Sequence, residues 1–177
     1  MPDEIGNRYF NEGSAASTIS LRRIDDKTLG DLLAVAIAEA TPEEVMPPVP
    51  GPAGWNDARQ AAFLAFHKER RSGLGGPHAE VYFAILDGSR IVGSARLKRS
   101  DPCTFETGMW LARCARGRGI GSNALLALKQ RAAAEGATRV VARTTQGNTA
   151  AIGALRNSGA EIGEPDEHGQ VRAEFRL

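Results

Sequence analysis

The amino-acid sequence predicts an α/β domain of the α+β kind, in which a mixed sheet of about seven strands carries helices on both faces. Segments with strand and helix patterns alternate in the order βααβββαβαββ. Three of the strands follow one another with only short turns between them, which predicts an antiparallel meander. A glycine-rich loop then joins a strand to a helix, which predicts a crossover to a parallel strand.

Length and composition limit the number of domains, the partners and the cellular location that we expect. The chain has 177 residues, enough for one domain with a single core. Its 22 Lys and Arg against 21 Asp and Glu give a net charge of +1, so we expect no nucleic acid as a partner. No apolar run approaches the roughly 20 residues that span a bilayer, so we expect no membrane either. Two cysteines, Cys103 and Cys114, and no N-terminal apolar segment predict a cytoplasmic protein without a disulfide framework.

Residues 1–17 are polar and rich in small side chains, which predicts a flexible tail and a folded domain over residues 18–177. The domain opens with Thr18–Arg23, where apolar and polar residues alternate as in a half-buried strand. A helix should follow, with Asp25 or Asp26 as its N-cap. Its apolar face is expected to consist of Leu29, Leu32, Leu33 and Ile37.

The next segment, Thr41–Gly54, is rich in proline and glycine, which interrupt helices and favour turns. A long irregular segment in a compact domain is usually functional or mobile. A second helix is predicted over Ala58–Arg71. Its polar end, from His67 onward, is expected to be solvated, which favours a surface role for His67 over that of a catalytic base.

The central elements begin with a hairpin. Two runs, Ala79–Leu86 and Arg90–Leu97, flank Asp87-Gly88-Ser89, and this pattern is typical of a tight turn between antiparallel strands. Thr104–Ala112 continues the meander. A helix is predicted over Ser122–Glu135, followed by a parallel strand over Thr138–Thr145. The closing elements are a short helix over Thr149–Asn157 and two strands over Ala160–Ile162 and Val171–Leu177.

The loop Arg116–Ser122 organises this arrangement. Its three glycines let successive backbone N–H groups approach a ligand at the N-terminus of a helix. Arg116 and Arg118 stand where cations are unfavourable unless an anion is bound. The pattern therefore predicts a phosphate or pyrophosphate site, while a plain glycine turn before a surface helix remains the alternative.

Three phosphate motifs compete for this loop. A Walker loop requires a lysine that is absent. Gly119–Ala124 fits the dinucleotide pattern G-x-G-x-x-A, but the preceding strand carries Glu106, and Arg143 stands where that motif needs an acid. The third motif is R-x-x-G-x-G, which begins at Arg116.

This third motif, placed after three meandering strands, resembles the acetyl-CoA pyrophosphate loop of the GNAT superfamily of N-acetyltransferases. A second motif of that family, N-x-x-[AS] followed by glycine eleven positions after the Asn, matches Asn148, Ala151 and Gly159. Three further segments are similar to the Rim-type branch, which acetylates ribosomal-protein N-termini, and to its antibiotic-modifying relatives: Thr41–Pro47, Arg90–Leu97 and Glu106–Leu111.

The resemblance implies the GNAT fold over residues 18–177 and acetyl-CoA as cofactor, with no metal. It implies transfer of an acetyl group to a primary amine, on a protein N-terminus or a small molecule such as an antibiotic, by direct attack in a ternary complex. Glu106, a carboxylate inside the strand that carries the cofactor, is the candidate base and is expected to act through water. Its alternative role is that of an exposed strand carboxylate or of a partner for a neighbouring arginine. The implied cofactor contacts are Leu111, Ala112, Arg113, Arg116, Gly117, Arg118, Gly119, Ile120, Gly121, Ser122, Asn148 and Ala151.

The sequence also departs from the family pattern. Many members carry a Tyr seven positions after the Asn as a general acid, and here Leu155 stands there. Ala151 replaces a Ser that many Rim-type members use, so the acid is not identified. A noncatalytic acyl-CoA-binding regulator and a nicotinamide dinucleotide enzyme stay open as alternative functions. A homodimer also stays open as the oligomeric state. Acceptor choice is expected to reside in Thr41–Gly54 and in the helix that follows it.

Overall fold

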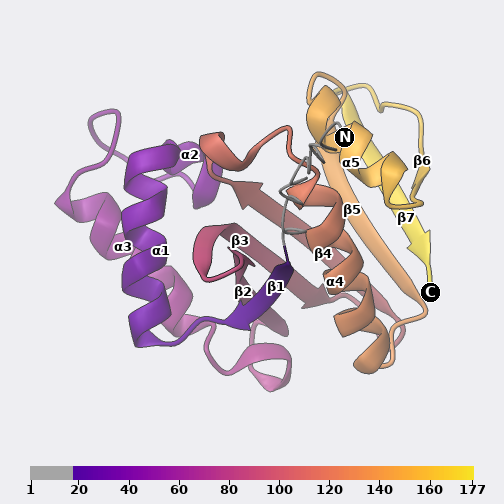
Figure 1. The fold of residues 1–177 in the computed structure, drawn as a ribbon, viewed down its shortest axis with the longest axis horizontal. Coiled ribbons are helices and arrows are strands. Elements are labelled where there is room, and N and C mark those ends of the chain that lie inside the picture. Colours follow the sequence, from indigo (N-terminus) through magenta and orange to yellow (C-terminus); the bar gives the residue numbers. More distant parts are fainter. Residues whose placement is uncertain (1–17) are drawn as a thin grey trace, which may run out of the picture.

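The computed structural model describes residues 18–177, and the predicted N-terminal tail over residues 1–17 lies outside the described residues. Seven strands form one mixed sheet in the order β1-β2-β3-β4-β5-β7-β6 (Figure 1). The strands are β1 Ile19–Arg23, β2 Glu80–Asp87, β3 Arg90–Arg99, β4 Thr104–Leu111, β5 Arg139–Thr145, β6 Glu161–Ile162 and β7 Gln170–Arg176. The α-helices are α1 Asp26–Glu39, α2 Pro42–Val45, α3 Asp57–Glu69, α4 Ile120–Ala134 and α5 Thr149–Asn157.

β2, β3 and β4 form the predicted antiparallel meander, and β1 pairs antiparallel with the outer side of β2. β2 and β3 are joined by only two residues, Gly88-Ser89, and Gly88 has a φ of 60°. Such positive φ values are what two-residue hairpin turns require. The short turn pairs Asp87 with Arg90, and an irregularity between Ile85 and Leu86 then shifts the register by one residue. This shift brings Glu80 opposite Lys98, so it later decides the composition of the site.

The carboxyl end of β4 lies very close to β3. Gly93 pairs with Leu111, and a Cβ at Gly93 would stand 2.2 Å from the carbonyl oxygen of Trp110. Only glycine permits this approach of two backbones. Gly93 therefore fixes the position from which the glycine-rich loop departs.

β4 and β5 run parallel, as the helical crossover predicts. Their pairing ends where Thr107 lies opposite Ala142. Beyond this point β4 stays paired with β3 as far as Leu111, and β5 stays paired with β7 as far as Thr145. The two central strands thus separate toward their carboxyl ends, a feature called the β4–β5 separation below.

Side chains of the sheet enter two apolar clusters, one on each face. Phe105 of β4 packs with Leu128 of α4 in the larger cluster. Trp110, five residues further along β4, packs against the smaller cluster, which contains Leu32 of α1 and Phe63 of α3. Since neighbouring side chains of a strand point to opposite faces, helices cover both faces of the sheet, which confirms the predicted fold class.

The start of one helix differs from the prediction by two residues, and one short helix was not predicted. α4 begins at Ile120 and not at Ser122, because Gly119 at its N-cap has a φ of 75°, after which the chain is already helical. Thr41–Gly54 contains a short helix, α2, which begins with Pro42 at its first position. A hydrogen bond of 2.8 Å from the Thr41 N–H to the Glu44 carboxylate closes its first turn.

One side chain of α1 also differs from the prediction. Leu29, Leu32 and Ala36 form the buried stripe of this helix, whereas Ile37 is 40% exposed. Successive helical residues lie about 100° apart around the axis, so Ile37 stands beside the stripe and not on it.

Candidate functional site

The loop between β4 and α4 presents backbone N–H groups at the start of a helix. Gly117 and Gly119 have φ values of 73° and 75°, which glycine adopts without strain. Because Gly119 is the N-cap and has no side chain, the cap itself supplies no acceptor for the first N–H groups of α4. Unpaired N–H groups at a helix start are suited to bind an anion.

Two arginines of this loop bring positive charge to that site. Arg116 lies 3.0 Å from the Glu44 carboxylate and donates from Nε to the carbonyl oxygen of Leu111. Arg118 lies 3.3 Å from the Asp87 carboxylate. Both arginine side chains are about half exposed, and ion pairs at such positions contribute little to stability, so a phosphate can replace the carboxylates at small cost.

The N-terminus of α5 adjoins the end of β5. Asn148 accepts a hydrogen bond of 3.1 Å from the Ala151 N–H, so it is the N-cap of this helix. A Cβ at Gly121 of α4 would lie 3.6 Å from Leu111 and 3.7 Å from Ala154 of α5. The end of β4, the first turn of α4 and the middle of α5 therefore meet beside the β4–β5 separation.

Some predicted cofactor residues have fewer groups available to a ligand than the sequence suggests. Ile120 and Ala112 are 2% and 1% exposed, so their side chains belong to the core. The Ala112 N–H is already donated to the carbonyl oxygen of Val92. The Arg113 guanidinium donates to the carbonyl oxygen of Ala38 at 3.2 Å, away from the loop N–H groups. These residues position the loop, and only backbone groups of Arg113 and Ile120 stay available to a ligand.

Glu106 lies in β4 just before the β4–β5 separation. Its side chain is 30% exposed and lies 3.1 Å from Arg143 and 3.7 Å from Arg96. It shares a face of the sheet with Trp110, opposite α4. The alternative role as an ion-pair partner is thus present in the structure, and it also holds the carboxylate in one place.

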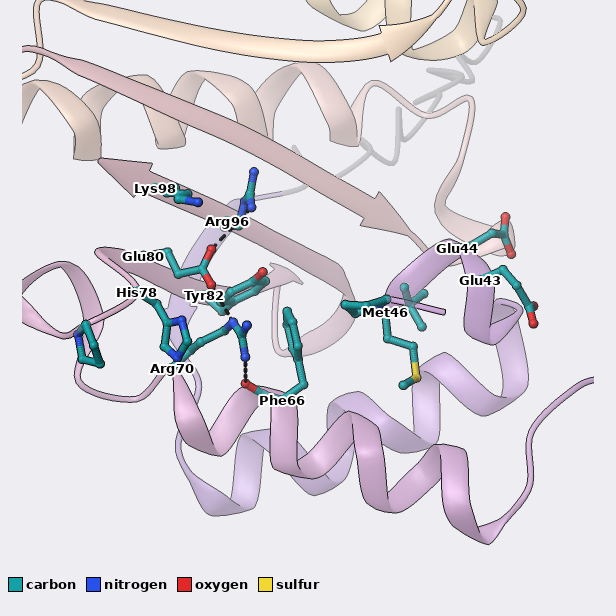
Figure 2. A pocket seen from close by; sticks show the side chains of 13 residues that line it. Glu43, Glu44, Met46, Phe66, Arg70, His78, Glu80, Tyr82, Arg96 and Lys98 are labelled. Carbon is teal, nitrogen blue, oxygen red and sulfur yellow. Dashed lines mark hydrogen bonds and ion pairs between the residues drawn. The ribbon is translucent and has the colours of Figure 1, made fainter. Parts of the chain in front are cut away.

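A pocket of about 730 Å³ opens on the same face of the sheet. Its walls are Glu43–Pro47, the last turns of α3, and the strands β2 and β3 (Figure 2). Lys98 lies directly opposite Glu106 across β3 and β4, which places the pocket next to the candidate base. The lining side chains of the sheet are Glu80, Tyr82, Arg96 and Lys98.

Glu80 is the centre of an ion-pair cluster in this pocket. It is 5% exposed and lies 2.5 Å from Arg70 and 3.4 Å from Arg96. Arg70 also stacks 3.7 Å from the centre of the Phe66 ring (Figure 2). Burial, followed by the charge of Glu80, raises the pKa of Tyr82, so this phenol stays protonated at neutral pH.

The sequence reading missed this cluster, although a signal was present. Glu80 and Tyr82, like Arg96 and Lys98, stand at alternate positions of two strands joined by a two-residue turn. Polar side chains at alternate positions share one face of a sheet. Such a row on two central strands indicates either a solvated face or a site. The turn alone would have placed Glu80 opposite Leu97, and only the register shift between Ile85 and Leu86 brings it opposite Lys98.

The irregular segment Thr41–Gly54 is fixed by a buried arginine. Arg59 of α3 is 6% exposed, donates to the carbonyl oxygens of Gly54 and Val49, and lies 3.2 Å from the Glu43 carboxylate. The segment therefore forms a preformed wall of the pocket. A hydrogen bond from the Thr41 N–H, followed by one from Arg116, lowers the pKa of Glu44.

The prediction of a surface position for His67 is wrong. His67 is 5% exposed and packs between the rings of Phe63, Phe66 and Tyr82 at centroid distances of 4.7, 5.4 and 5.0 Å. Both ring nitrogens lack a hydrogen-bond partner among the described residues. Burial, followed by the charge of Arg70, lowers the pKa of His67 to about 4. His67 lies one helical repeat after Phe63, a spacing that indicated the inward face.

Arg70, which was expected in the same solvated end of α3, also points inward to Glu80. Leu155, at the family's Tyr position, is 5% exposed and belongs to the larger apolar cluster. Cys103 and Cys114 are free and exposed. Within residues 18–177, His, Cys, Asp and Glu form no group of three that could hold a metal ion, and no helix there is long and apolar enough to cross a membrane.

Solved structures share this architecture. Campylobacter jejuni N-acetyltransferase PseH, in complex with acetyl coenzyme A, has a TM-score of 0.66 and 12% identity over 90% of this chain and 99% of its own. RimL, a ribosomal L7/L12 alpha-N-protein acetyltransferase in complex with coenzyme A, has a TM-score of 0.67 and 16% identity over 90% and 94%. Microcin C7 self immunity acetyltransferase MccE, in complex with acetyl-CoA and AMP, has a TM-score of 0.68 and 16% identity over 90% and 92%. At these identities the similarity establishes the fold.

A family model adds the assignment that the fold alone does not give. Among curated proteins, no sequence matches this chain. Residues 19–161, however, match the model of the acetyltransferase (GNAT) domain. The matched range runs from β1 to β6 and so includes the glycine-rich loop, the β4–β5 separation and Glu106. Sequence motifs, fold and family model agree, and the chain belongs to the GNAT acetyltransferase family.

Proposed function

We propose that this protein is an acetyl-CoA-dependent N-acetyltransferase that moves an acetyl group to a primary amine by direct attack in a ternary complex. The observation that carries the proposal is the β4–β5 separation, which lies between the N-termini of α4 and α5. An extended ligand that enters there meets N–H groups at one end and an exposed sheet face at the other.

The residues of the loop fit the phosphates of acetyl-CoA. The N–H groups of Gly117–Ser122 and the guanidinium groups of Arg116 and Arg118 supply donors and charge for a diphosphate. Backbone groups near Leu111–Arg113 border the separation, where the pantetheine arm and the thioester carbonyl oxygen are expected. Acetyl-CoA supplies the activated acetyl group when it is bound.

Proton removal falls to Glu106. An attacking amine must arrive neutral, and Glu106 lies directly opposite Lys98, which lines the pocket. Arg143 and Arg96 hold its carboxylate in place at 3.1 and 3.7 Å. We propose that Glu106 draws a proton from the incoming ammonium, directly or through water. The acceptor amine then enters through the pocket formed by Glu43–Pro47, α3 and β2–β3.

Two measurements test the proposal. A thermal-shift panel with acetyl-CoA, CoA and NAD(P) should give stabilisation by the first two ligands. A thiol-release assay over a panel of amines should then give a rate that depends on the amine. Stabilisation by NAD(P) alone would support the dinucleotide alternative, and binding of acetyl-CoA without turnover on any amine would support the noncatalytic regulator.

Gly121→Val is expected to abolish stabilisation by acetyl-CoA. The added Cβ fits beside Leu111 and Ala154, so the variant should fold, but its branched methyl groups enter the space between α4 and the end of β4. At a hundredfold excess over its dissociation constant, acetyl-CoA should stabilise the wild type by about 2.7 kcal/mol. Gly30→Val is the matched control, because Gly30 is a helical glycine like Gly121. Nothing lies within 4 Å of the Cβ position of Gly30, so this valine should not affect acetyl-CoA binding. A full shift for Gly121→Val would remove the loop from the cofactor site.

Leu155→Tyr should not speed thiol release, although it restores the family's usual side chain. Leu155 is 5% exposed in a packed cluster, so a ring there is expected to cost about 1–3 kcal/mol of stability. Leu155→Phe controls for bulk, and both variants should turn over no faster than wild type. Thiolate is a tolerable leaving group near neutral pH because a thiol pKa is roughly 8.5. A large gain for Leu155→Tyr alone would indicate that the chain has lost its general acid.

A further inference from the structure

The pocket beside Glu106 contains an unbalanced row of charges. Glu80, Lys98 and Glu106 lie directly opposite one another across β2, β3 and β4, so their side chains share one face. Arg96 precedes Lys98 by two residues in β3 and therefore shares that face. A lysine between two carboxylates would ordinarily pair with one of them.

The ion-pair partners of Glu80 and Glu106 are three arginines and not Lys98. Arg70 lies 2.5 Å from Glu80, and Arg143 lies 3.1 Å from Glu106. Arg96 lies between the two carboxylates, 3.4 Å from Glu80 and 3.7 Å from Glu106. These two contacts are long for charge-assisted hydrogen bonds, so Arg96 can accommodate a closer partner.

Lys98 is left without a carboxylate. No ion pair joins it to any residue in the described range 18–177, and its side chain is only partly exposed. Arg70 also lies 3.3 Å from the exposed carboxylate of Glu69, so three carboxylates face four cations in this part of the molecule. Like charges that are partly withdrawn from water repel one another, so an anion bound between Lys98 and Arg96 would relieve that repulsion.

The acidic residues of α2 do not correct this imbalance. Glu43 is paired with Arg59 at 3.2 Å, and Glu44 is paired with Arg116 at 3.0 Å. Figure 2 shows both at the opposite end of the pocket from Lys98. The walls between the two ends are largely apolar and aromatic, with Phe66 and Met46 among the lining residues.

We propose that the acceptor is an amino-carboxylate, whose anionic group is held by Lys98 and Arg96 while its amine faces Glu106. This inference rests on the proposed acetyl transfer. Because Arg96 contacts Glu106, the acid and the amine of the acceptor are separated by few bonds. A pocket of about 730 Å³ suits a small molecule or the first residues of a peptide. A cationic amine without an acid group, such as an aminoglycoside, is disfavoured by the same charges.

Calorimetry with unreactive probes tests the charge preference without requiring turnover. The first pair is N-acetylphenylalanine and its neutral amide, which tests the carboxylate of a free amino acid. The second pair is acetyl-Ala-Asp-amide and acetyl-Ala-Asn-amide, which tests an acidic side chain in a peptide. In at least one pair the acid should bind about tenfold or more tightly than the neutral probe at fixed ionic strength. The pair that shows the preference identifies the source of the carboxylate.

Variants assign the preference to Lys98. Lys98→Met should remove it, whereas Lys98→Arg should retain it. Lys27→Met is the matched control, because Lys27 is exposed at the start of α1 and does not line the pocket, and it should leave the preference unchanged. Equal binding of acid and neutral probe in both pairs, no binding by any probe, or an unchanged preference in Lys98→Met would overturn the inference. Failed thiol release with an intact preference would refute the acetyl transfer and not the anion subsite.

Discussion

Glu106→Gln is expected to lower the rate of acetyl transfer by about 10²–10⁴-fold, the usual contribution of a positioned general base. Glutamine keeps the shape and polarity of the side chain but cannot take the proton of the incoming ammonium. The affinity for acetyl-CoA should change little, because we propose that the loop residues, and not Glu106, bind the phosphates. Single-turnover thiol release measures the rate, and the acetyl-CoA thermal shift measures the binding.

Glu174→Gln provides the control for this experiment. Glu174 of β7 lies in the same row of the sheet as Glu106, since both are register partners of Val141. It is similarly half-buried and is also paired with arginines, Arg139 and Arg172. The control should leave the rate near that of wild type. An unchanged rate for Glu106→Gln would remove Glu106 from the mechanism, and equal losses in both variants would indicate a structural effect.

The rate should also depend on pH in a defined direction. Attack requires a neutral amine and a deprotonated base, so the wild-type rate should rise with pH until both conditions are met. In Glu106→Gln, the increase in rate that comes from deprotonation of the base should disappear. The increase that comes from deprotonation of the acceptor amine should remain. A pH series of single-turnover rates for both proteins measures the difference.

His67 should make the fold sensitive to acid. Its pKa is about 4 in the folded protein against 6.5 for an ordinary histidine, because burial disfavours the charged ring. Between these two values the unfolded chain binds a proton that the native chain does not, so the free energy of unfolding rises with pH. Stability is therefore lost as pH falls from 6.5 toward 4, by a total of about 3 kcal/mol. Urea unfolding at pH 7 and pH 4.5 measures this loss.

His67→Leu should remove most of that loss. Leucine is close to histidine in size and leaves no ring nitrogen without a hydrogen-bond partner. Other groups titrate over the same range, but the difference between wild type and variant isolates His67. His168→Leu is the control at an exposed position, where the side chain is 78% exposed. If wild type and His67→Leu lose equal stability on acidification, the environment of His67 differs from the one described.

Local sequence determined most of the fold. The two-residue turn at Gly88-Ser89 fixed a hairpin, Asp25 and Asn148 fixed helix starts, and the crossover through α4 fixed a parallel pair of strands. These features depend on neighbours within a few residues, on glycine φ values and on the handedness of connections. The anion loop was predictable for the same reason, because its N–H groups and arginines lie in one short segment.

Only the tertiary structure decided the environments of individual side chains. α3 lies over β2, and this packing buries His67 and brings Arg70 to Glu80, although both residues stand in a polar stretch of sequence. Likewise, Arg96 and Arg143 share Glu106 because three strands from different parts of the chain lie side by side. Helix and strand patterns indicate which face of an element a residue lies on. Its burial, ion pairs and pKa depend on what packs against that face. The loop that we propose holds the cofactor was therefore predictable from the sequence, whereas the charges that we propose receive the acceptor were set by long-range packing.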